Sequence, residues 1–342
     1  DDAGLAYEIY SNIKPNPTIE NVQTGVAAFK ASGADYLVAI GGGSSMDTAK
    51  AIGIIIANPE FEDVRSLEGV APTKKPSIPI IAVPTTAGTA AEVTINYVIT
   101  DVEKKRKFVC VDTHDIPVVA VIDPEMMSSM PKGLTAATGM DALTHAIEAY
   151  VSTLNGPFTD PLALQAIEMV LDYLPASYHC DMVAREQMHY AQCLAGMAFS
   201  NALLGIVHSM AHKTGAAFST GHIPHGCANA IYLPYVIQYN AKDPVAAKRY
   251  AEIARRMGLP GTSEKALINS LIEKIDDFNV RLNIPKTLKD FGINEDEFKE
   301  KVDKIAELAV GDACTGSNPR AIDPAAMAKL LTCTYYGTEV DF

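Results

Sequence analysis

The first third of the chain alternates short apolar runs with helical patterns. Apolar runs typical of buried strands occupy residues 36–40, 78–83, 94–100, 107–111 and 118–122. Helical periodicity over residues 18–30 stops at Ser32-Gly33, which is a helix-ending signal. A second helix is expected to begin with Ser44 or Ser45 as its cap and to run toward Ala57. Because strands and helices alternate, the pattern predicts an α/β fold with a mostly parallel sheet.

From residue 133 onward the pattern changes to helices without interleaved strands. The expected helices cover residues 134–152, 160–174, 182–203, 205–218, 226–239, 244–257, 263–281, 295–309 and 323–336. The change falls at Pro131 to Gly133, where no long linker separates the two parts. We therefore predict an α/β domain over residues 1–132 and an all-α domain over residues 133–342, packed closely together.

Two polar turns follow the first two predicted strands, at 41–44 (GGGS) and 84–89 (PTTAGT). Open α/β sheets bind ligands at the carboxyl ends of their strands. Glycines let the backbone approach a phosphate, and the amino end of a following helix favours its charge. The segment GGGSSMDTAK matches neither a Walker A motif nor G-x-G-x-x-G, because Met46 takes the place of the third glycine. By themselves, these two segments are explained equally well as tight turns with a purely structural role and as a phosphate-binding site. Asp47 can be explained by a structural role, because a negative charge near the amino end of a helix interacts favourably with the helix dipole.

Histidines gather in residues 207–226, which hold His208, His212, His222 and His225. His208 and His212 are four residues apart, as are Asp141 and His145 upstream, so each pair projects from one helix face. A single histidine in an apolar helix is usually a hydrogen-bonded core residue. Two such pairs and a Pro-His-Gly loop together indicate a divalent-metal site. The segment HSMAH lacks the glutamate of H-E-x-x-H, which disfavours a zincin peptidase.

Composition narrows the class of protein. The chain has 342 residues, of which 48% are hydrophobic and 20% charged, and this favours a globular protein with room for two domains. Its net charge of -13 argues against nucleic acid and an anionic membrane as partners. The six cysteines form no C-x-x-C pair and predict free thiols in a reducing cytoplasm. No apolar run approaches the length of a membrane span, and the amino end is not a signal peptide. Because it lacks an initiating methionine, we expect the sequence to begin inside a longer protein.

Five blocks carry a specific resemblance: GGGSSMDTAK, VPTTAGTAAEVT, GMDALTHAIEAY, GIVHSMAHKTGA and HIPHG. In this order, and across essentially the whole chain, they resemble the iron-dependent (group III) alcohol dehydrogenases. The resemblance implies a dinucleotide-binding α/β domain, a helical metal-binding domain, and a metal and substrate in the cleft between them.

The resemblance also implies roles for individual residues. Metal-ligand positions, for Fe²⁺ with Zn²⁺ as an alternative, fall on Asp141, His145, His208 and His225. His212 matches a catalytic histidine thought to relay a proton. Positions that contact NAD, with NADP as an alternative, fall on Asn16, Gly42, Gly43, Ser44, Thr85, Thr86, Thr89 and Lys107. The acidic residue that selects NAD in the family is expected upstream of residue 1. For His222 three interpretations stay open: it relays a proton like His212, it orients His225, or it is a loop histidine without a role in the site.

Substrate expectations come from finer likenesses within the family. Residues 5–150 are similar to the lactaldehyde reductases, which are 1,2-propanediol oxidoreductases, whereas the loop at 219–221 and the HIPHG segment resemble butanol-type and bifunctional enzymes. We therefore expect a homodimeric oxidoreductase that interconverts small alcohols or 1,2-diols and aldehydes by hydride transfer. A lyase similar to dehydroquinate synthase would need a strongly basic pocket, but only Lys213 accompanies the histidines. A noncatalytic scaffold is the other alternative, and turnover of propanediol with NAD⁺ would separate all three.

Overall fold

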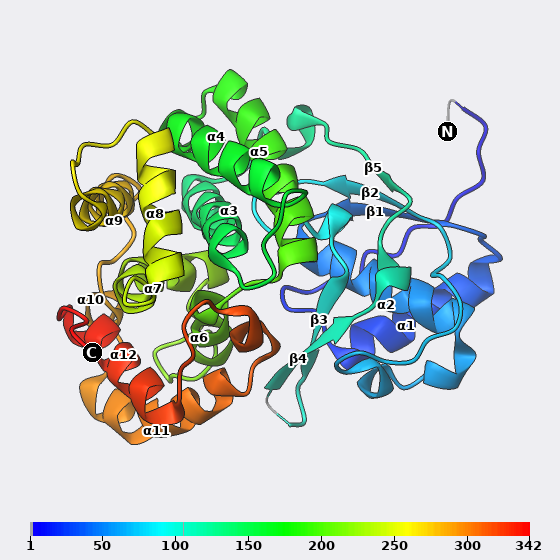
Figure 1. The fold of residues 1–342 in the computed structure, drawn as a ribbon. Coiled ribbons are helices and arrows are strands. Elements are labelled where there is room, and N and C mark those ends of the chain that lie inside the picture. The colour runs from blue at the N-terminus through cyan, green and yellow to red at the C-terminus, as the bar shows by residue number, and fades with distance from the viewer. Residues whose placement is uncertain (1–2, 105) are drawn as a thin grey trace. The chain divides into compact units, whose positions relative to one another are not determined.

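The chain forms two compact units, Asp1–Met127 and Ser128–Phe342. The computed structural model describes residues 3–104 and 106–342, and Figure 1 shows the path of the chain. The first unit mixes strands and helices, and the second is helical. This is the predicted succession of an α/β region and an all-α region.

The first unit is built on a parallel sheet, as predicted. Its helices and strands are α1 (Ile19–Ser32), β1 (Leu37–Gly41), α2 (Gly43–Ala57), β2 (Ile80–Pro84), β3 (Asn96–Asp101), β4 (Arg106–Val111) and β5 (Val119–Ala120). Within the described residues, β1, β2 and β5 form one sheet in the order β1-β2-β5, with both pairings parallel. The helix predicted over residues 18–30 is also confirmed, and it begins at Ile19 and ends at Ser32. Thr18 and Asn21 form a capping box at its start, and Gly33 ends it at a φ of 67°.

The strands β3 and β4 do not join the parallel sheet, which corrects our expectation for residues 94–100 and 107–111. They pair with each other as an antiparallel hairpin, with Asn96 opposite Val111 and Asp101 opposite Arg106. Only residues 102–105 separate the two strands. A connection of that length allows an antiparallel pair, whereas a parallel pair needs a crossover of a dozen or more residues.

Helix α2 ties the hairpin into the core of the first unit. Ile52, Ile54 and Ile55 of α2 pack in one buried cluster with Tyr97 and Ile99 of β3. Lys50, a fully buried residue of the same helix, donates from Nζ to the backbone oxygens of Thr94 and Asn96 at 2.6 and 3.0 Å. A buried ammonium is tolerated only with such partners. Asp115 adds a carboxylate 3.5 Å from the same nitrogen.

The second unit consists of packed helices. They are α3 (Lys132–Val151), α4 (Asp160–Tyr178), α5 (Met182–Ala202), α6 (Ile206–Thr214), α7 (His225–Asn240), α8 (Pro244–Arg256), α9 (Glu264–Arg281), α10 (Leu288–Phe291), α11 (Glu295–Val310) and α12 (Pro324–Tyr336). In Figure 1, α3 runs through the middle of this unit and contacts α4, α5, α7 and α8. Short 3-10 turns complete the chain, at Pro59–Phe61, Val64–Leu67, Ala91–Val93, Thr113–Asp115, Pro124–Met127 and Ala313–Ser317.

Two helical predictions need correction. The helix expected over residues 205–218 ends at Thr214 and is followed by turns up to Thr220 and by Gly221, which has a φ of 113°. That conformation suits glycine and does not continue a helix. The short helix α10 was not predicted, because one turn carries too little periodicity. Among the described residues, no single helix is long and apolar enough to cross a membrane; α5 and α6 reach that length and composition only together, with a 102° bend between them.

Candidate metal centre and nucleotide turns

The four predicted metal ligands lie together in the second unit. Helix α3 carries Asp141 and His145, α6 carries His208, and His225 is the first residue of α7. From Asp141 Oδ1, the Nε2 atoms of His145, His208 and His225 lie at 3.8, 3.6 and 3.6 Å. Ligands held about 2.0–2.2 Å from a tetrahedral metal lie roughly 3.3–3.6 Å apart. The spacing and the three-nitrogen, one-oxygen donor set therefore suit a divalent cation such as Fe²⁺ or Zn²⁺.

The electrostatics of this cluster also suit a cation. Burial by itself would raise the pKa of Asp141, but His145, His225 and His208 hold that pKa well below its usual range. Burial opposes the charged form of His208 too, yet hydrogen bonds to Asp141 and Glu148 raise its pKa to about 9. The pKa of His225 is lowered, chiefly by burial. An ionised carboxylate among crowded imidazoles is a place where a metal can replace protons.

Glu148 completes the arrangement of His208, and our sequence reasoning missed it. Its Oε2 lies 2.6 Å from His208 Nδ1, and its Oε1 accepts a hydrogen bond from the backbone N–H of Val207 at 2.8 Å. A proton held on Nδ1 leaves the Nε2 lone pair for a metal. A signal was present in the sequence, because Glu148 follows Asp141 by seven residues and so shares its face of α3.

Asn229 is a second residue that we missed. It lies on α7, four residues after His225, and is fully buried. Its Nδ2 donates to Asp141 Oδ1 at 2.7 Å and lies 3.2 and 3.3 Å from Nε2 of His208 and His225. His225 and Asn229 form a third pair at a spacing of four residues, which was the available sequence signal.

His212, the predicted relay, lies beside the ligands on the last turn of α6. Its ring stacks on that of His225, with centroids 5.3 Å apart. Its Nδ1 is 3.2 Å from Asp312 Oδ2, and Lys213 Nζ is 2.7 Å from the same oxygen. Burial would raise the pKa of Asp312, but His212 and Lys213 hold it well below its usual range. Asp312 was not predicted, and His222 lies exposed in the loop before α7.

The Pro-His-Gly segment has a steric explanation. A β-carbon at Gly226 would lie 1.9 Å from the backbone oxygen of Ala137 and 3.1 Å from Asp141 Cβ. Glycine thus lets the first turn of α7 touch α3. Pro224 occupies the N-cap position with a φ of -55°. Together they place His225 next to Asp141 at the point where α7 begins.

The two polar turns of the first unit also lie against each other. The N–H of Thr85 donates to Gly41 O at 2.9 Å. A β-carbon at Gly42 would lie 3.2 Å from Thr86 Cγ2, and one at Gly43 would lie 3.1 Å from Thr89 Cγ2. Five of the eight predicted cofactor positions are therefore neighbours at the carboxyl ends of β1 and β2.

The start of α2 differs from our expectation that Ser44 or Ser45 caps it. Gly42 is the N-cap and offers no side-chain hydrogen bond, so Ser44 and Ser45 lie inside the first turn. Ser44 Oγ instead accepts the N–H of Asn16 at 3.3 Å. With a glycine cap, the first N–H groups of α2 lack a side-chain partner and point out of the helix end, where they suit a phosphate.

The remaining cofactor positions, Asn16 and Lys107, meet beside Ser44. Lys107 Nζ donates to Asn16 Oδ1 at 2.7 Å, and Asn16 has a φ of 58°. Burial lowers the pKa of Lys107, partly offset by the charge of Asp47. Asp47 lies beyond the first turn of α2 and accepts the N–H of Val98 at 3.1 Å. Its carboxylate thus binds the hairpin rather than the helix end.

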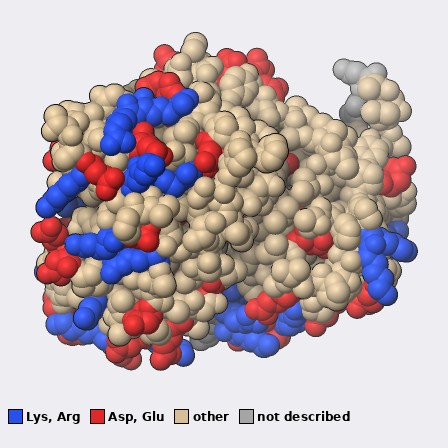
Figure 2. Space-filling model, viewed as in Figure 1, with Lys and Arg blue, Asp and Glu red and all other residues tan. Residues whose placement is uncertain are grey.

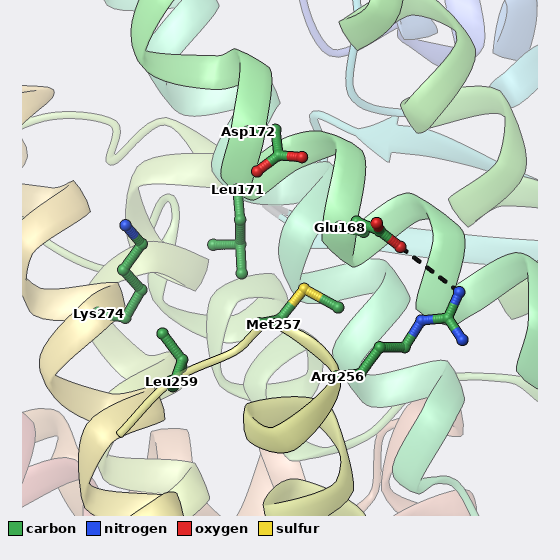
Figure 3. A pocket seen from close by; sticks show the side chains of 7 residues that line it. All are labelled: Glu168, Leu171, Asp172, Arg256, Met257, Leu259 and Lys274. Atoms are coloured by element: carbon green, nitrogen blue, oxygen red, sulfur yellow. Dashed lines mark hydrogen bonds and ion pairs between the residues drawn. The ribbon is translucent and has the colours of Figure 1, made fainter.

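A surface pocket elsewhere in the second unit offers no comparable chemistry (Figure 3). It is lined by Glu168, Leu171, Asp172, Arg256, Met257, Leu259 and Lys274. Glu168 and Arg256 pair across it at 3.4 Å.

Comparison with known proteins decides the family. Residues 1–124 match the iron-containing alcohol dehydrogenases, and residues 135–335 match the Fe-containing alcohol dehydrogenase family, C-terminal. The chain belongs to the iron-containing alcohol dehydrogenases. The family and fold inferred from the five sequence blocks are thereby confirmed, and the protein is an oxidoreductase rather than a lyase or a scaffold.

Relatives within the iron-containing alcohol dehydrogenases resemble the chain over most of its length. It is 53% identical over 343 residues to an NADPH-dependent butanol dehydrogenase of Clostridium saccharobutylicum, covering 100% of this chain and 87% of that protein. It is 55% identical over 322 residues to a lactaldehyde reductase of Escherichia coli K12, covering 94% and 82%. The crystal structure of a 1,3-propanediol oxidoreductase superposes with a TM-score of 0.91 at 39% identity, covering 98% and 86%.

Proposed function

We propose that this protein interconverts small alcohols or 1,2-diols and the matching aldehydes, using one divalent metal and a nicotinamide cofactor. The observation that carries the proposal is the convergence of Asp141, His145, His208 and His225, with three imidazole nitrogens 3.6–3.8 Å from one carboxylate oxygen. The names of its relatives, which include a butanol dehydrogenase and a lactaldehyde reductase, support this substrate class.

The metal ligands are proposed to be those four residues, with Fe²⁺ in first place because the family is iron-containing. Zn²⁺ is the alternative, since it binds nitrogen and oxygen sites more tightly than Fe²⁺. When bound, the metal would polarise the substrate oxygen and lower the pKa of an alcohol. The protein contributes the ligand geometry, and Glu148 keeps His208 in the tautomer that presents Nε2.

His212 is proposed to carry the proton that alcohol oxidation releases. Its Nδ1 faces Asp312, so its Nε2 remains to exchange a proton. The ring of His212 stacks on that of His225 and so lies next to the proposed ligands. The His212 side chain is 21% exposed to solvent. A partly exposed imidazole beside a carboxylate can accept a proton and pass it on.

The cofactor phosphates are proposed to lie at the amino end of α2, among Gly42, Gly43 and Ser44 and the threonines 85, 86 and 89. Lys107 and Asn16 lie next to Ser44 and would add a cation and an amide. A helix amino end and a lysine both favour phosphate. NAD is the proposed cofactor and NADP is the alternative, which the NADPH-dependent butanol relative supports.

Substrates of two to four carbons are proposed, because butanol, lactaldehyde and propanediol enzymes all resemble the chain. A kinetic panel of ethanol, 1,2-propanediol, 1-butanol and 1-octanol with NAD⁺ and NADP⁺ tests this. We expect kcat/KM to be highest within the C2–C4 group. A higher kcat/KM for octanol than for propanediol and butanol would overturn the proposed substrate class.

The metal assignment has its own test. Elemental analysis should find one divalent metal per wild-type chain and a clear loss in His225→Ala. Undiminished metal in that variant would refute the ligand set.

For the cofactor, Gly43→Val should raise the dissociation constant of NAD, because the side chain meets Thr89 and blocks the turn, while metal content stays unchanged. Unchanged NAD binding by calorimetry would contradict the nucleotide site.

A further inference from the structure

Asn229 makes contacts that neither helix packing nor the ligand set requires. Its amide nitrogen lies 2.7 Å from Asp141 Oδ1 and within 3.3 Å of Nε2 on both His208 and His225. Three of the four proposed ligand atoms therefore surround one amide nitrogen. Its Oδ1 is buried and receives no hydrogen bond from the residues that the structure describes. A buried acceptor without a donor is unfavourable, so Asn229 is a poor choice for packing alone.

The chemistry of the three acceptors ranks these contacts. The amide carries two hydrogens, so it cannot satisfy three acceptors at once. An imidazole Nε2 has a single lone pair, which is used either for the amide or for a metal. A carboxylate oxygen has lone pairs for both. The bond to Asp141, which is also the shortest, can therefore persist when a cation binds, whereas the contacts to the two histidines must give way.

We propose that Asn229 is a positioning residue of the metal centre. It holds the Asp141 carboxylate in the orientation that meets the three imidazoles. The inference rests on the proposed metal-binding function and deepens it. Asn229 thereby raises metal affinity without being a ligand, as groups that hydrogen-bond to metal ligands do.

The experiment measures metal binding rather than turnover. Metal-free wild type, Asn229→Ala and Asn229→Leu are titrated with Co²⁺ and Zn²⁺ against a chelator of known affinity. We expect both variants to bind about 10–100-fold more weakly. The visible absorption of bound Co²⁺, which reports ligand geometry, should change as well. Asn229→Leu keeps the site filled should the alanine variant fold poorly, and melting of each metal-free variant records its fold.

A matched control comes from the same helix. Asn240 is also buried on α7, and its amide bonds to Tyr250 and Asn318 rather than to any proposed ligand. Asn240→Ala should leave Co²⁺ affinity and absorption unchanged. Wild-type affinity and absorption in both Asn229 variants would overturn the inference, as would equal losses in Asn229→Ala and Asn240→Ala. Failure of the wild type to bind one metal would instead refute the proposed function.

Discussion

At the scale of single residues, the hydrogen-bond partners of the ring nitrogens distinguish His208, the proposed metal ligand, from His212, the proposed proton relay. His208 turns Nδ1 toward the buried Glu148 and Nε2 toward Asp141. His212, one turn later, turns Nδ1 toward Asp312. Both histidines lie on one face of α6, yet one points into the buried cluster and the other is partly exposed. The shared spacing of four residues does not distinguish them; the carboxylates do.

The first prediction separates metal binding from proton transfer. His212→Ala should retain metal and cofactor while kcat falls about 10²–10⁴-fold and its pH dependence flattens, because a relay is lost and the ligands remain. His208→Ala should lose the metal and the activity with it. Elemental analysis and pH–rate profiles check both variants. Metal loss in His212→Ala with metal retained in His208→Ala would show that the two roles are reversed.

The second prediction concerns Glu148. Glu148→Gln removes the negative charge opposite His208 Nδ1 and places an amide near the N–H of Val207. We expect metal affinity to fall about 10–100-fold, since such partners orient the ligand and raise its basicity. Chelator competition measures this. Glu168→Gln, at the surface pocket of the same unit, is the control and should bind metal like the wild type.

At the scale of elements, the metal centre depends on how closely three helix segments approach. Gly226 of α7 allows its contact with α3, and Gly139 of α3 allows the neighbouring contact of α3 with α4. A β-carbon at Gly139 would lie 2.3 Å from Leu174 Cδ1 of α4, and one at Gly226 would strike the backbone of α3. Side-chain ends can move aside, whereas a backbone carbonyl in the middle of a helix cannot. The contact at Gly226 is therefore the stricter of the two.

Gly226→Ala should push the start of α7 away from α3 and carry His225 with it. We expect a loss of roughly 1–3 kcal/mol in the free energy of unfolding, as for overpacked cores, together with weaker metal binding. Gly133→Ala in α3 is the matched control, because a β-carbon there meets nothing within 4 Å. Chemical denaturation and metal titration compare the two. Equal stability and metal affinity in both variants would contradict the steric argument.

We expect the contact between α2 and β3 to depend on pH. Burial raises the pKa of Asp47 from 3.8 to about 7, although Lys50 and Lys107 oppose the shift. Between about pH 4 and pH 7 the folded protein thus binds more protons here than the unfolded chain, so this group lowers stability as pH rises. Asp47→Asn removes this group, so its free energy of unfolding relative to wild type should be about 1–2 kcal/mol higher at pH 8 than at pH 4. The figure is reduced because the Asp47 side chain is partly exposed.

Denaturation of wild type and Asp47→Asn at the two pH values measures this difference. Asp303→Asn changes an exposed carboxylate on α11 and serves as the control. A stability difference between wild type and Asp47→Asn that is the same at pH 4 and pH 8 would refute the shift.

At the scale of the whole molecule, the two units carry different chemistry. All four proposed metal ligands belong to Ser128–Phe342, and all eight proposed cofactor positions belong to Asp1–Met127. On the face shown in Figure 2, acidic and basic side chains lie interspersed.

This separation predicts a local response to metal removal. A chelator should speed amide hydrogen exchange in α3, α6 and α7, because a metal at 100 times its dissociation constant stabilises its site by about 2.7 kcal/mol. Exchange in α1 and α2 should not change. NAD should instead slow exchange at the start of α2. Mass spectrometry of proteolytic peptides resolves these segments, and an equal chelator effect on α2 and α6 would contradict the assignment.

The sequence by itself determined the features that depend on near neighbours. Helical periodicity and capping residues such as Thr18 and Gly33 act within a few positions, so most helix bounds followed from them. The pairs Asp141–His145 and His208–His212 are also local, because one helical turn places them on one face. Long motif blocks then indicated the family, which the comparisons confirmed.

Only the tertiary structure decided which distant groups meet. Glu148 and His208 are 60 residues apart, Asn229 and Asp141 are 88 apart, and Asp312 and His212 are 100 apart. No local pattern encodes these hydrogen bonds, since they arise from how α3, α6, α7 and the turn that begins at Asp312 pack. The antiparallel pairing of β3 and β4 and the use of Gly42 as the cap of α2 have the same origin. Backbone pairing and close approach are set by the folded surroundings, and residue propensity alone does not contain them.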